Sequence, residues 1–342
     1  MADAVRVAII GAGRMGIKHG TNFAKYVHGS QVAYVVDSDR ERADKLAAEL
    51  GTRSAYDVDA VINSPDVDAV VISTPIFTHK EFCLKAAAAG KHIFCEKPLA
   101  LTERDAEEIV EAVDRAGVKF LIAFMSRFDR SFELAKEKLE QNAIGTPVFV
   151  RSTGRDPGLP PVPGWGSDPE ACGDIAFELC SHDYDRMRWL LNDEVKSVYA
   201  RAAILSSKDV AAKCGGKMIN DTLVVLVEFT RGTLAAVDGL LNIKYGYDAR
   251  VEVVGDQGFI SVGDVRYVDV GVATGSKEYR VGVAPSFLDR FYEAYIKEAQ
   301  HFVDCILHDL PTRANARDGL EAVRIALAVN ESIKSGRPVT LR

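Results

Sequence analysis

Residues 5–16, VRVAIIGAGRMG, decide the fold of this chain. Val5–Ile10 is a continuous apolar run, typical of a strand buried on both faces of a parallel sheet. Gly11, Gly13 and Gly16 follow with a spacing that allows a tight turn and a close approach of the backbone to a phosphate. We therefore predict a strand, a glycine turn, and a helix whose N-terminus binds the pyrophosphate of a dinucleotide, through residues that include Arg14 and Met15.

An acidic residue supports a dinucleotide site over a merely structural glycine turn in some other α/β fold. The second apolar run, Val32–Val36, ends at Asp37, about 20 residues beyond the glycines. A carboxylate there accepts hydrogen bonds from the adenosine ribose and repels a 2′-phosphate, which favours NAD over NADP. Arg40 is the opposing signal, because an arginine so close could pair with that phosphate. We expect NAD as the cofactor, with NADP the less favoured alternative.

The first 124 residues alternate apolar runs with helical stretches, as parallel βαβ units do. Ser38-x-x-Glu41 and Thr102-x-x-Asp105 are expected to cap two of the helices. We predict an α/β Rossmann domain over residues 1–124. Its later strands are expected at residues 32–36, 53–55, 68–73, 92–95 and 120–124.

After Arg127 the regular alternation of apolar runs and helical stretches ends. Apolar β-rich runs recur with turns between them from Val195 to Val262, and two helices close the chain. A long proline-rich loop over residues 154–173 precedes these β-rich runs. Loops of that length are usually functional or disordered. We predict an α+β domain over residues 125–342, built on a large, mostly antiparallel open sheet.

Composition narrows the class of protein. The chain is 47% hydrophobic and 27% charged with a net charge of −7 and no dense Lys/Arg tract, which argues against a nucleic-acid partner or an anionic membrane surface. No apolar run approaches the roughly 20 residues that span a membrane, and too few residues precede the first strand for a leader peptide. The six cysteines show no metal-type spacing. We expect a cytoplasmic protein without a metal ion.

Glu96-Lys97-Pro98 directly follows the apolar run at residues 92–95. Ligands of open α/β sheets collect beyond the carboxyl ends of the strands, so Lys97 is expected beside the reactive ring of a bound dinucleotide. A lysine there can exchange a proton during hydride transfer, if burial or a neighbouring cation favours its neutral form. Glu96 is expected at the nicotinamide ribose. The alternative is an ordinary surface lysine.

Residues at the end of another predicted strand are expected to line the middle of the cofactor. These are Ser73, Thr74 and Pro75, after the run at residues 68–73. His79 either starts a helix facing the cofactor or is a plain surface histidine.

Glu178 and His182 form a second candidate cluster. They are four residues apart, so on one helix they share a face. A carboxylate–imidazole pair can hold a substrate hydroxyl and move its proton. The alternative is a helix start rich in acidic residues, where Asp183 and Asp185 suit the helix dipole. The presence of Lys97 and of a dinucleotide site favours the catalytic interpretation.

Four stretches together resemble the family of glucose–fructose oxidoreductase and inositol dehydrogenase: VAIIGAGRMG, STPIFTH, CEKPLALT, and GDIAFELCSHDYD followed by RWLL. The stretch at residues 127–161 most resembles inositol 2-dehydrogenases. The resemblance implies a Rossmann domain followed by a sheet domain, and a homo-oligomer, a tetramer or dimer, assembled through the sheets.

The resemblance also implies roles for particular residues. Lys97 matches the catalytic lysine, and His182 matches the histidine that binds the reacting hydroxyl. Glu178 stands where inositol dehydrogenases usually carry aspartate, and Gly173-Asp174 replaces the usual glycine pair, which leaves the substrate open. Arg127 and Asp156 match substrate-contacting positions, so the contacts expected from the resemblance are Arg127, Asp156, Glu178 and His182. Tyr245 is a further candidate contact, with a place in the core or in an interface as the alternative.

We therefore predict an NAD-dependent dehydrogenase that oxidises a secondary hydroxyl of a cyclic polyol or pyranose sugar to the ketone. Two alternatives remain within the same fold. One is a glycosidase that retains NAD and acts by transient oxidation and elimination, and the other is a non-catalytic NAD-binding sugar sensor. Retention of Lys97 and His182 argues against the sensor, since binding alone needs no base.

Overall fold

The computed structural model describes residues 4–263, 266–268 and 282–341, and the chain forms two compact units. The first comprises residues 1–128 and 293–323, and the second residues 129–292 and 324–342. Neither unit is one continuous segment of the chain, because residues 293–323 return to the first unit. The boundary at residue 124 stays a prediction about domain limits along the sequence.

The first unit is built on a six-stranded parallel sheet in the order β3-β2-β1-β4-β5-β6. β1 pairs with β2 on one side and with β4 on the other, so the direction of winding reverses beside β1. That reversal is where open α/β sheets bind their ligands. The strands are β1 (Val5–Ile10), β2 (Ser30–Val36), β3 (Arg53–Ala55), β4 (Ala69–Ile72), β5 (His92–Cys95) and β6 (Phe120–Ile122).

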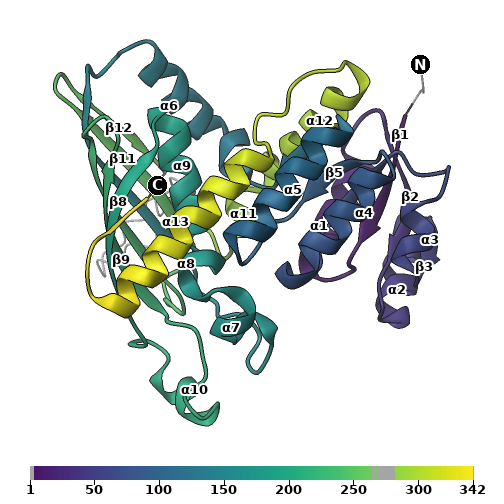
Figure 1. Ribbon diagram of the computed structural model, residues 1–342, viewed down its shortest axis with the longest axis horizontal. Helices are drawn as coiled ribbons and strands as arrows, with labels where there is room; N and C mark the ends of the chain where they lie inside the picture. Colours follow the sequence, from purple (N-terminus) through teal and green to yellow (C-terminus); the bar gives the residue numbers. More distant parts are fainter. Residues whose placement is uncertain (1–3, 264–265, 269–281, 342) are drawn as a thin grey trace, which may run out of the picture. The chain divides into compact units, whose positions relative to one another are not determined.

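Helices connect these strands, as Figure 1 shows in the purple to blue part of the chain. They are α1 (Arg14–Lys25), α2 (Arg40–Leu50), α3 (Val58–Ile62), α4 (His79–Ala88) and α5 (Glu103–Ala116), with short 3₁₀ turns η1 (Ile76–Thr78) and η2 (Met125–Phe128). Late in the chain, α12 (Tyr292–Leu307) and the first turns of α13 (Ala316–Ser335) also belong to this unit.

Two predicted helix starts have different outcomes. The Thr102 hydroxyl accepts a hydrogen bond from the Asp105 amide at 3.1 Å, so this predicted cap is confirmed. The cap at Ser38 is wrong, because α2 begins at Arg40 and its capping residue is Asp39. The Asp37 carboxylate accepts the Asp39 amide at 2.8 Å, and this turn keeps the chain extended for one more residue.

The second unit is built on a seven-stranded sheet in the order β12-β11-β7-β10-β9-β8-β15. Only β10 and β7 pair in parallel, and the other neighbours are antiparallel. The strands are β7 (Pro147–Arg155), β8 (Val195–Ala203), β9 (Thr222–Phe229), β10 (Leu234–Leu240), β11 (Asp248–Gly255), β12 (Phe259–Val262) and β15 (Val339–Thr340), beside a separate pair, β13 (Arg266–Val268) and β14 (Gly282–Val283).

Helices cover one face of this sheet. Figure 1 shows α6 (Arg130–Glu140), α8 (Asp174–Glu178) and α9 (Ser181–Leu191) along it. Alternate residues of β9 and β10, such as Val225 and Val237, are buried against that layer. The short helices are η3 (Trp165–Ser167), α7 (Pro169–Cys172), α10 (Lys208–Lys213) and α11 (Phe287–Arg290).

These two sheets confirm the predicted fold class: a Rossmann-type parallel sheet, then an α+β unit with a mostly antiparallel sheet. In the described ranges, no helix is long and apolar enough to cross a membrane.

Candidate active site

The glycine turn between β1 and α1 has a shape that only glycine permits at two of its positions. Gly11 has φ +98°, and a Cβ on it would lie 2.8 Å from the Ser73 carbonyl oxygen. A Cβ on Gly16 would lie 1.8 Å from the Gly11 carbonyl oxygen. Gly13 differs, because nothing lies within 4 Å of where its Cβ would be. The turn is therefore closely packed at Gly11 and Gly16 and open at Gly13, as the close approach of a ligand to the backbone requires.

The N-terminus of α1 is ready to bind an anion. No side chain caps it at Gly13, and its first turn holds no acidic residue. Arg14 and Met15, both predicted cofactor residues, are the first two residues of this helix. Amide groups of a helical first turn lack intrahelical partners and attract negative charge, so the pyrophosphate of a dinucleotide fits here.

Asp37 stands beside the glycine turn at the end of β2. Its Oδ2 accepts the Ala12 amide at 2.7 Å, and its Oδ1 accepts the Asp39 amide at 2.8 Å. Two backbone donors thus fix the carboxylate in the place where a ribose-binding acid is expected. The Ser73 hydroxyl donates to the Ile10 and Gly11 carbonyls at 3.1 and 3.0 Å, so Ser73 supports the turn through its side chain.

His79 is the first residue of α4, as one of the two alternatives predicted, and the other alternative, a surface histidine, is wrong. It is buried, and its ring nitrogens lie 2.9 Å from the carbonyl oxygens of Pro98 and Thr74. Burial lowers the pKa of His79, and the two backbone contacts oppose that shift only in part. The side chain ties the segment after β4 to the Lys97–Pro98 segment after β5. His79 therefore positions two loops that sequence reasoning assigned to the cofactor.

A buried pair behind Lys97 was missed by sequence reasoning. His19 on α1 lies with its Nε2 2.7 Å from Glu96 Oε1, and Glu96 Oε2 accepts the Lys97 amide at 3.1 Å. Burial alone raises the pKa of Glu96, but the hydrogen bond to His19 and the charges of His19 and Lys97 outweigh it and lower that pKa. An ionised carboxylate only accepts, so Nε2 carries the hydrogen.

The available signal for His19 was its place on the buried face of α1. The buried residues Gly16, His19, Gly20 and Phe23 recur at helical spacing, so the ring had to face the sheet. It packs edge-on against Phe94 of β5, with ring centroids 4.8 Å apart. This histidine holds the side chain that precedes Lys97.

The second unit separates Glu178 and His182 between two helices, so the prediction of a single helix carrying both is wrong. Glu178 is the last residue of α8, and His182 is the second residue of α9. The break lies at Leu179–Cys180, where Cys180 packs against β10 so closely that a Cβ on Gly239 would lie 2.3 Å from its sulfur. This contact fixes the break between the two residues.

Asp174, the departure from the family's glycine pair, has a structural explanation. Its φ is +67°, a left-handed conformation that favours glycine. Its carboxylate accepts the Asn220 amide at 2.7 Å, the Asn220 side-chain nitrogen at 2.5 Å and the Ile175 amide at 2.8 Å. These bonds offset the strain and anchor the start of α8.

A buried network supports α9, on which His182 stands. Asp183 Oδ1 accepts from the Ser152 hydroxyl and from Arg186, both at 2.5 Å. Burial raises the pKa of Asp183, although Arg186 and Ser152 oppose the shift. Gly154 lets the strand approach, since a Cβ there would lie 2.6 Å from Asp183 Oδ2. Asp183 therefore joins α9 to β7, beyond simply suiting a helix dipole.

Two predicted substrate contacts, Arg127 and Asp156, have other partners in the structure. Arg127 is buried in the first unit, where its guanidinium donates to the Arg313 carbonyl at 2.6 Å and pairs with Asp318 at 2.9 Å. Asp156 directly follows β7, and its Oδ1 accepts the Gly158 amide at 2.7 Å. Their roles toward a substrate stay predictions.

Tyr245 lies in a cluster on the second sheet. Its hydroxyl donates to Asp248 at 2.7 Å and lies 3.1 Å from Arg155 Nη1. Because side chains alternate along β7, Arg155 points to the face opposite Ser152, which contacts α9. The structure therefore places Tyr245 with the face away from α9, and its substrate contact stays a prediction. Among the described residues, no group of three His, Cys, Asp or Glu side chains could hold a metal ion.

Comparison with known proteins identifies the family. A profile described as an oxidoreductase family with an NAD-binding Rossmann fold matches residues 5–124, and its C-terminal alpha/beta domain matches residues 136–341. The chain belongs to the glucose–fructose oxidoreductase and inositol dehydrogenase family. It is thus an oxidoreductase, and NAD is the cofactor for which its glycine turn, helix terminus and Asp37 are shaped.

Several relatives are similar over the whole length. The scyllo-inositol 2-dehydrogenase (NAD(+)) of Bacillus subtilis is 33% identical over 100% of this chain and 97% of its own, and the myo-inositol 2-dehydrogenase of Thermotoga maritima is 32% identical over 98% of both. A crystal structure of scyllo-inositol dehydrogenase from Lactobacillus casei with bound NAD(H) and scyllo-inositol superposes with a TM-score of 0.89 at 26% identity, covering 98% of this chain and 99% of that one.

Proposed function

We propose that this protein is an NAD-dependent dehydrogenase that oxidises one secondary hydroxyl of a cyclic polyol of the inositol type, or of a pyranose sugar, to a ketone. The observation that carries the proposal is the place of Lys97. It is the second residue after β5, at the carboxyl edge of a sheet whose winding reverses beside β1. The full-length similarity to inositol dehydrogenases supports the substrate class.

Lys97 is proposed to take the hydroxyl proton. NAD, when bound, accepts the hydride from the same carbon. Glu96 stays ionised through its bond with His19, and its Oε2 accepts the Lys97 amide. The backbone from which the Lys97 side chain extends is therefore held in place. His79 fixes the following residue, Pro98, from the other side. Lys97 itself is half-buried, which limits its freedom.

His182 is proposed to bind the reacting oxygen, with Glu178 orienting it. Asp183 and Asp174 secure the helices that carry this pair. Arg127, Asp156 and Tyr245 remain proposed contacts of the other hydroxyls; a polyol needs several partners, because each buried unpaired polar group is costly.

The test is NADH formation with purified protein, NAD and a panel of myo-inositol, scyllo-inositol, glucose, xylose and galactose. Lys97→Ala should abolish turnover while NADH still binds, as measured by its fluorescence. Lys45→Ala, which changes an exposed lysine on α2, is the matched control and should keep full activity. Bound NAD with no turnover on any polyol would overturn the proposal, and release of nitrophenol from nitrophenyl glycosides would then favour the NAD-retaining glycosidase.

We also propose that the protein forms a homo-oligomer, a dimer or a tetramer, through the second sheet. The face of this sheet that points away from α9 carries large exposed apolar side chains: Leu226 at 55%, Leu234 at 57% and Phe259 at 65% exposure. Apolar side chains clustered on one sheet face mark a contact surface. Leu226→Lys with Leu234→Glu should reduce the mass measured by light scattering, and a wild-type monomer would overturn this assignment. The cytoplasmic location stays a prediction.

A further inference from the structure

The corner between β2 and α2 holds two arginines, Arg40 and Arg42, and an arginine at this place is a candidate to bind a 2′-phosphate. NADP sites place an arginine near the end of this strand for that purpose. Arg42 is already paired, with its Nε 3.1 Å from Asp39 Oδ2. Between residues 37 and 44 the chain carries four acidic and two basic side chains, so the corner as a whole disfavours a phosphate.

Arg40 is held in a different way. Its guanidinium stacks over the ring of Tyr56, 4.6 Å from the ring centroid. The Tyr56 hydroxyl donates to Asp44 Oδ1 at 2.7 Å, and Asp44 lies one helical turn after Arg40 on α2. Hydrogen bonds from Ser54 and Tyr56 lower the pKa of Asp44, so its carboxylate stays charged beside the arginine.

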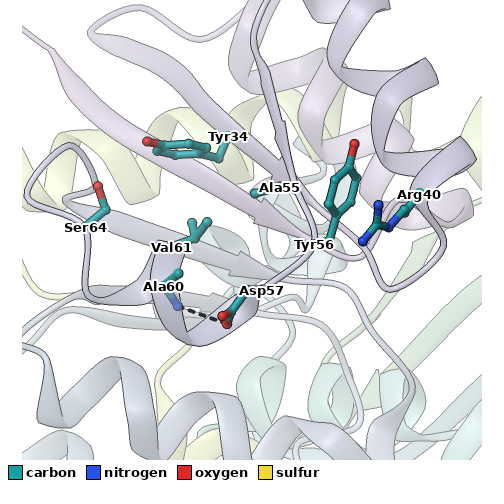
Figure 2. Close-up of a pocket in the computed structure, with 8 residues that line it drawn as sticks. All are labelled: Tyr34, Arg40, Ala55, Tyr56, Asp57, Ala60, Val61 and Ser64. Atoms are coloured by element: carbon teal, nitrogen blue, oxygen red, sulfur yellow. Dashed lines mark hydrogen bonds between the residues drawn. The ribbon is translucent and has the colours of Figure 1, made fainter.

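Figure 2 shows Arg40 and Tyr56 next to each other at one end of a cavity of about 530 Å³. A second ring, Tyr34, lines the same cavity but has a different cation, because Arg53 lies 4.0 Å from its centroid. The remaining lining residues are Ala55, Asp57, Ala60, Val61 and Ser64. Each tyrosine of this cavity therefore has its own arginine.

We propose that Tyr56, held by Asp44, withdraws Arg40 from phosphate binding and so determines the selectivity for NAD over NADP. An arginine bound to a 2′-phosphate must turn its forked edge to the phosphate. The contact with Tyr56 holds the guanidinium against the ring, and the charge of the Asp44 carboxylate attracts it to the same place. Asp37 repels the phosphate, and Tyr56 removes the cation that could compensate. The inference concerns the cofactor alone, so it does not depend on the proposed substrate.

The experiment measures dissociation constants for NADH and NADPH by the fluorescence of the bound dihydronicotinamide. The Asp37→Ser variant is the background, because it removes the repelling carboxylate. Adding Tyr56→Ala should raise NADPH affinity about 2–5-fold further, the fold-change that the loss of one exposed cation–π contact corresponds to. NADH affinity should change less than about 2-fold, since NADH lacks the phosphate that Arg40 would bind.

Three further variants on the Asp37→Ser background sharpen the result. Arg40→Ala added to Tyr56→Ala should erase the gain for NADPH, because the gain needs the guanidinium. Tyr34→Ala opens the same cavity without touching Arg40, and should leave the NADPH affinity unchanged. Tyr56→Phe keeps the ring and removes its bond to Asp44, and should give a smaller gain than Tyr56→Ala.

The inference is overturned if Tyr56→Ala leaves NADPH affinity unchanged, if it raises NADH and NADPH affinity alike, or if the gain survives Arg40→Ala. A gain from Tyr34→Ala equal to that from Tyr56→Ala would also overturn it, since cavity opening would then be the cause. NADH binding by the wild-type protein is measured first. Its absence would overturn the cofactor assignment itself, which separates that failure from a failure of the selectivity device.

Discussion

Replacing His19 with leucine should reverse the direction in which Glu96 makes the stability of the first unit depend on pH. Glu96 is 7% exposed and His19 is fully buried, so no water replaces the lost donor at Oε1. A hydrogen bond to a charged group contributes about 1.5–3 kcal/mol to stability. Of the two hydrogen bonds described for the Glu96 carboxylate, the variant keeps the one from the Lys97 amide. The matched control is His19→Gln, which has similar volume and a side-chain amide that can still donate.

The sign of the effect follows from the pKa of Glu96. In the wild type that pKa is lowered, so its contribution to stability is present above the ordinary carboxyl value, about 4.3, and is lost as the pH falls. Without a donor at position 19, burial raises the pKa of Glu96, and stability is instead lost as the pH rises above about 4.3. The two variants should therefore differ more at high pH than at low pH.

We expect His19→Gln to exceed His19→Leu in free energy of unfolding by about 1.5–3 kcal/mol at pH 8 and by less than about 1 kcal/mol at pH 5. Urea denaturation followed by circular dichroism measures both values. Neither variant has a histidine at this position, so the comparison isolates the hydrogen-bond donor that Glu96 loses. A difference that is equal at the two pH values would refute the reasoning, because loss of packing alone does not titrate.

Three other predictions follow from single contacts. Gly16→Ala should prevent stable folding, because its Cβ would lie 1.8 Å from the Gly11 carbonyl oxygen, whereas Gly13→Ala should melt as the wild type does and yet bind NADH more weakly in a fluorescence titration. Because the pKa of His79 is lowered in the folded protein, the unfolded chain binds more protons than the folded one below about pH 6.5. Wild-type stability should therefore fall as the pH decreases from about 6.5 to 5. His79→Asn should lose less stability over that range in the same denaturation assay. Asp174→Gly should lower the free energy of unfolding by about 1 kcal/mol, because the lost bonds to Asn220 exceed the relieved left-handed strain, and a more stable variant would contradict that balance.

Local patterns were sufficient to predict the parallel sheet of the first unit, but not the return of residues 293–323 to that unit. An apolar run, three glycines and Asp37 lie within 33 residues of one another, so the motif can be recognised within one short stretch of sequence. Parallel strands bring their carboxyl ends to one edge of a sheet, so the place of Lys97 after β5 followed from element order alone. The resemblance to a known family added the predicted partners His182 and Glu178, which spacing by itself left open.

Tertiary packing decided how these residues are held. His19 and Glu96 are 77 residues apart, and His79 joins backbone segments near residues 74 and 98. The break between Glu178 and His182 depends on the fit of Cys180 against Gly239, and the stack of Arg40 depends on Tyr56 from the next strand connection. Helical spacing in the sequence reports which residues could share a face, but not whether a neighbouring strand interrupts the helix.

The sequence by itself determined the succession of strands and the cofactor turn, because these depend on short-range periodicity and on the chirality of βαβ connections. It also determined which residue types are available for proton transfer. Only the tertiary structure decided which polar side chains are buried together. Burial fixes hydrogen-bond partners and shifts pKa values, and it arises when segments distant in sequence exclude water from between them. The support of Lys97 by Glu96 and His19 is of this second kind.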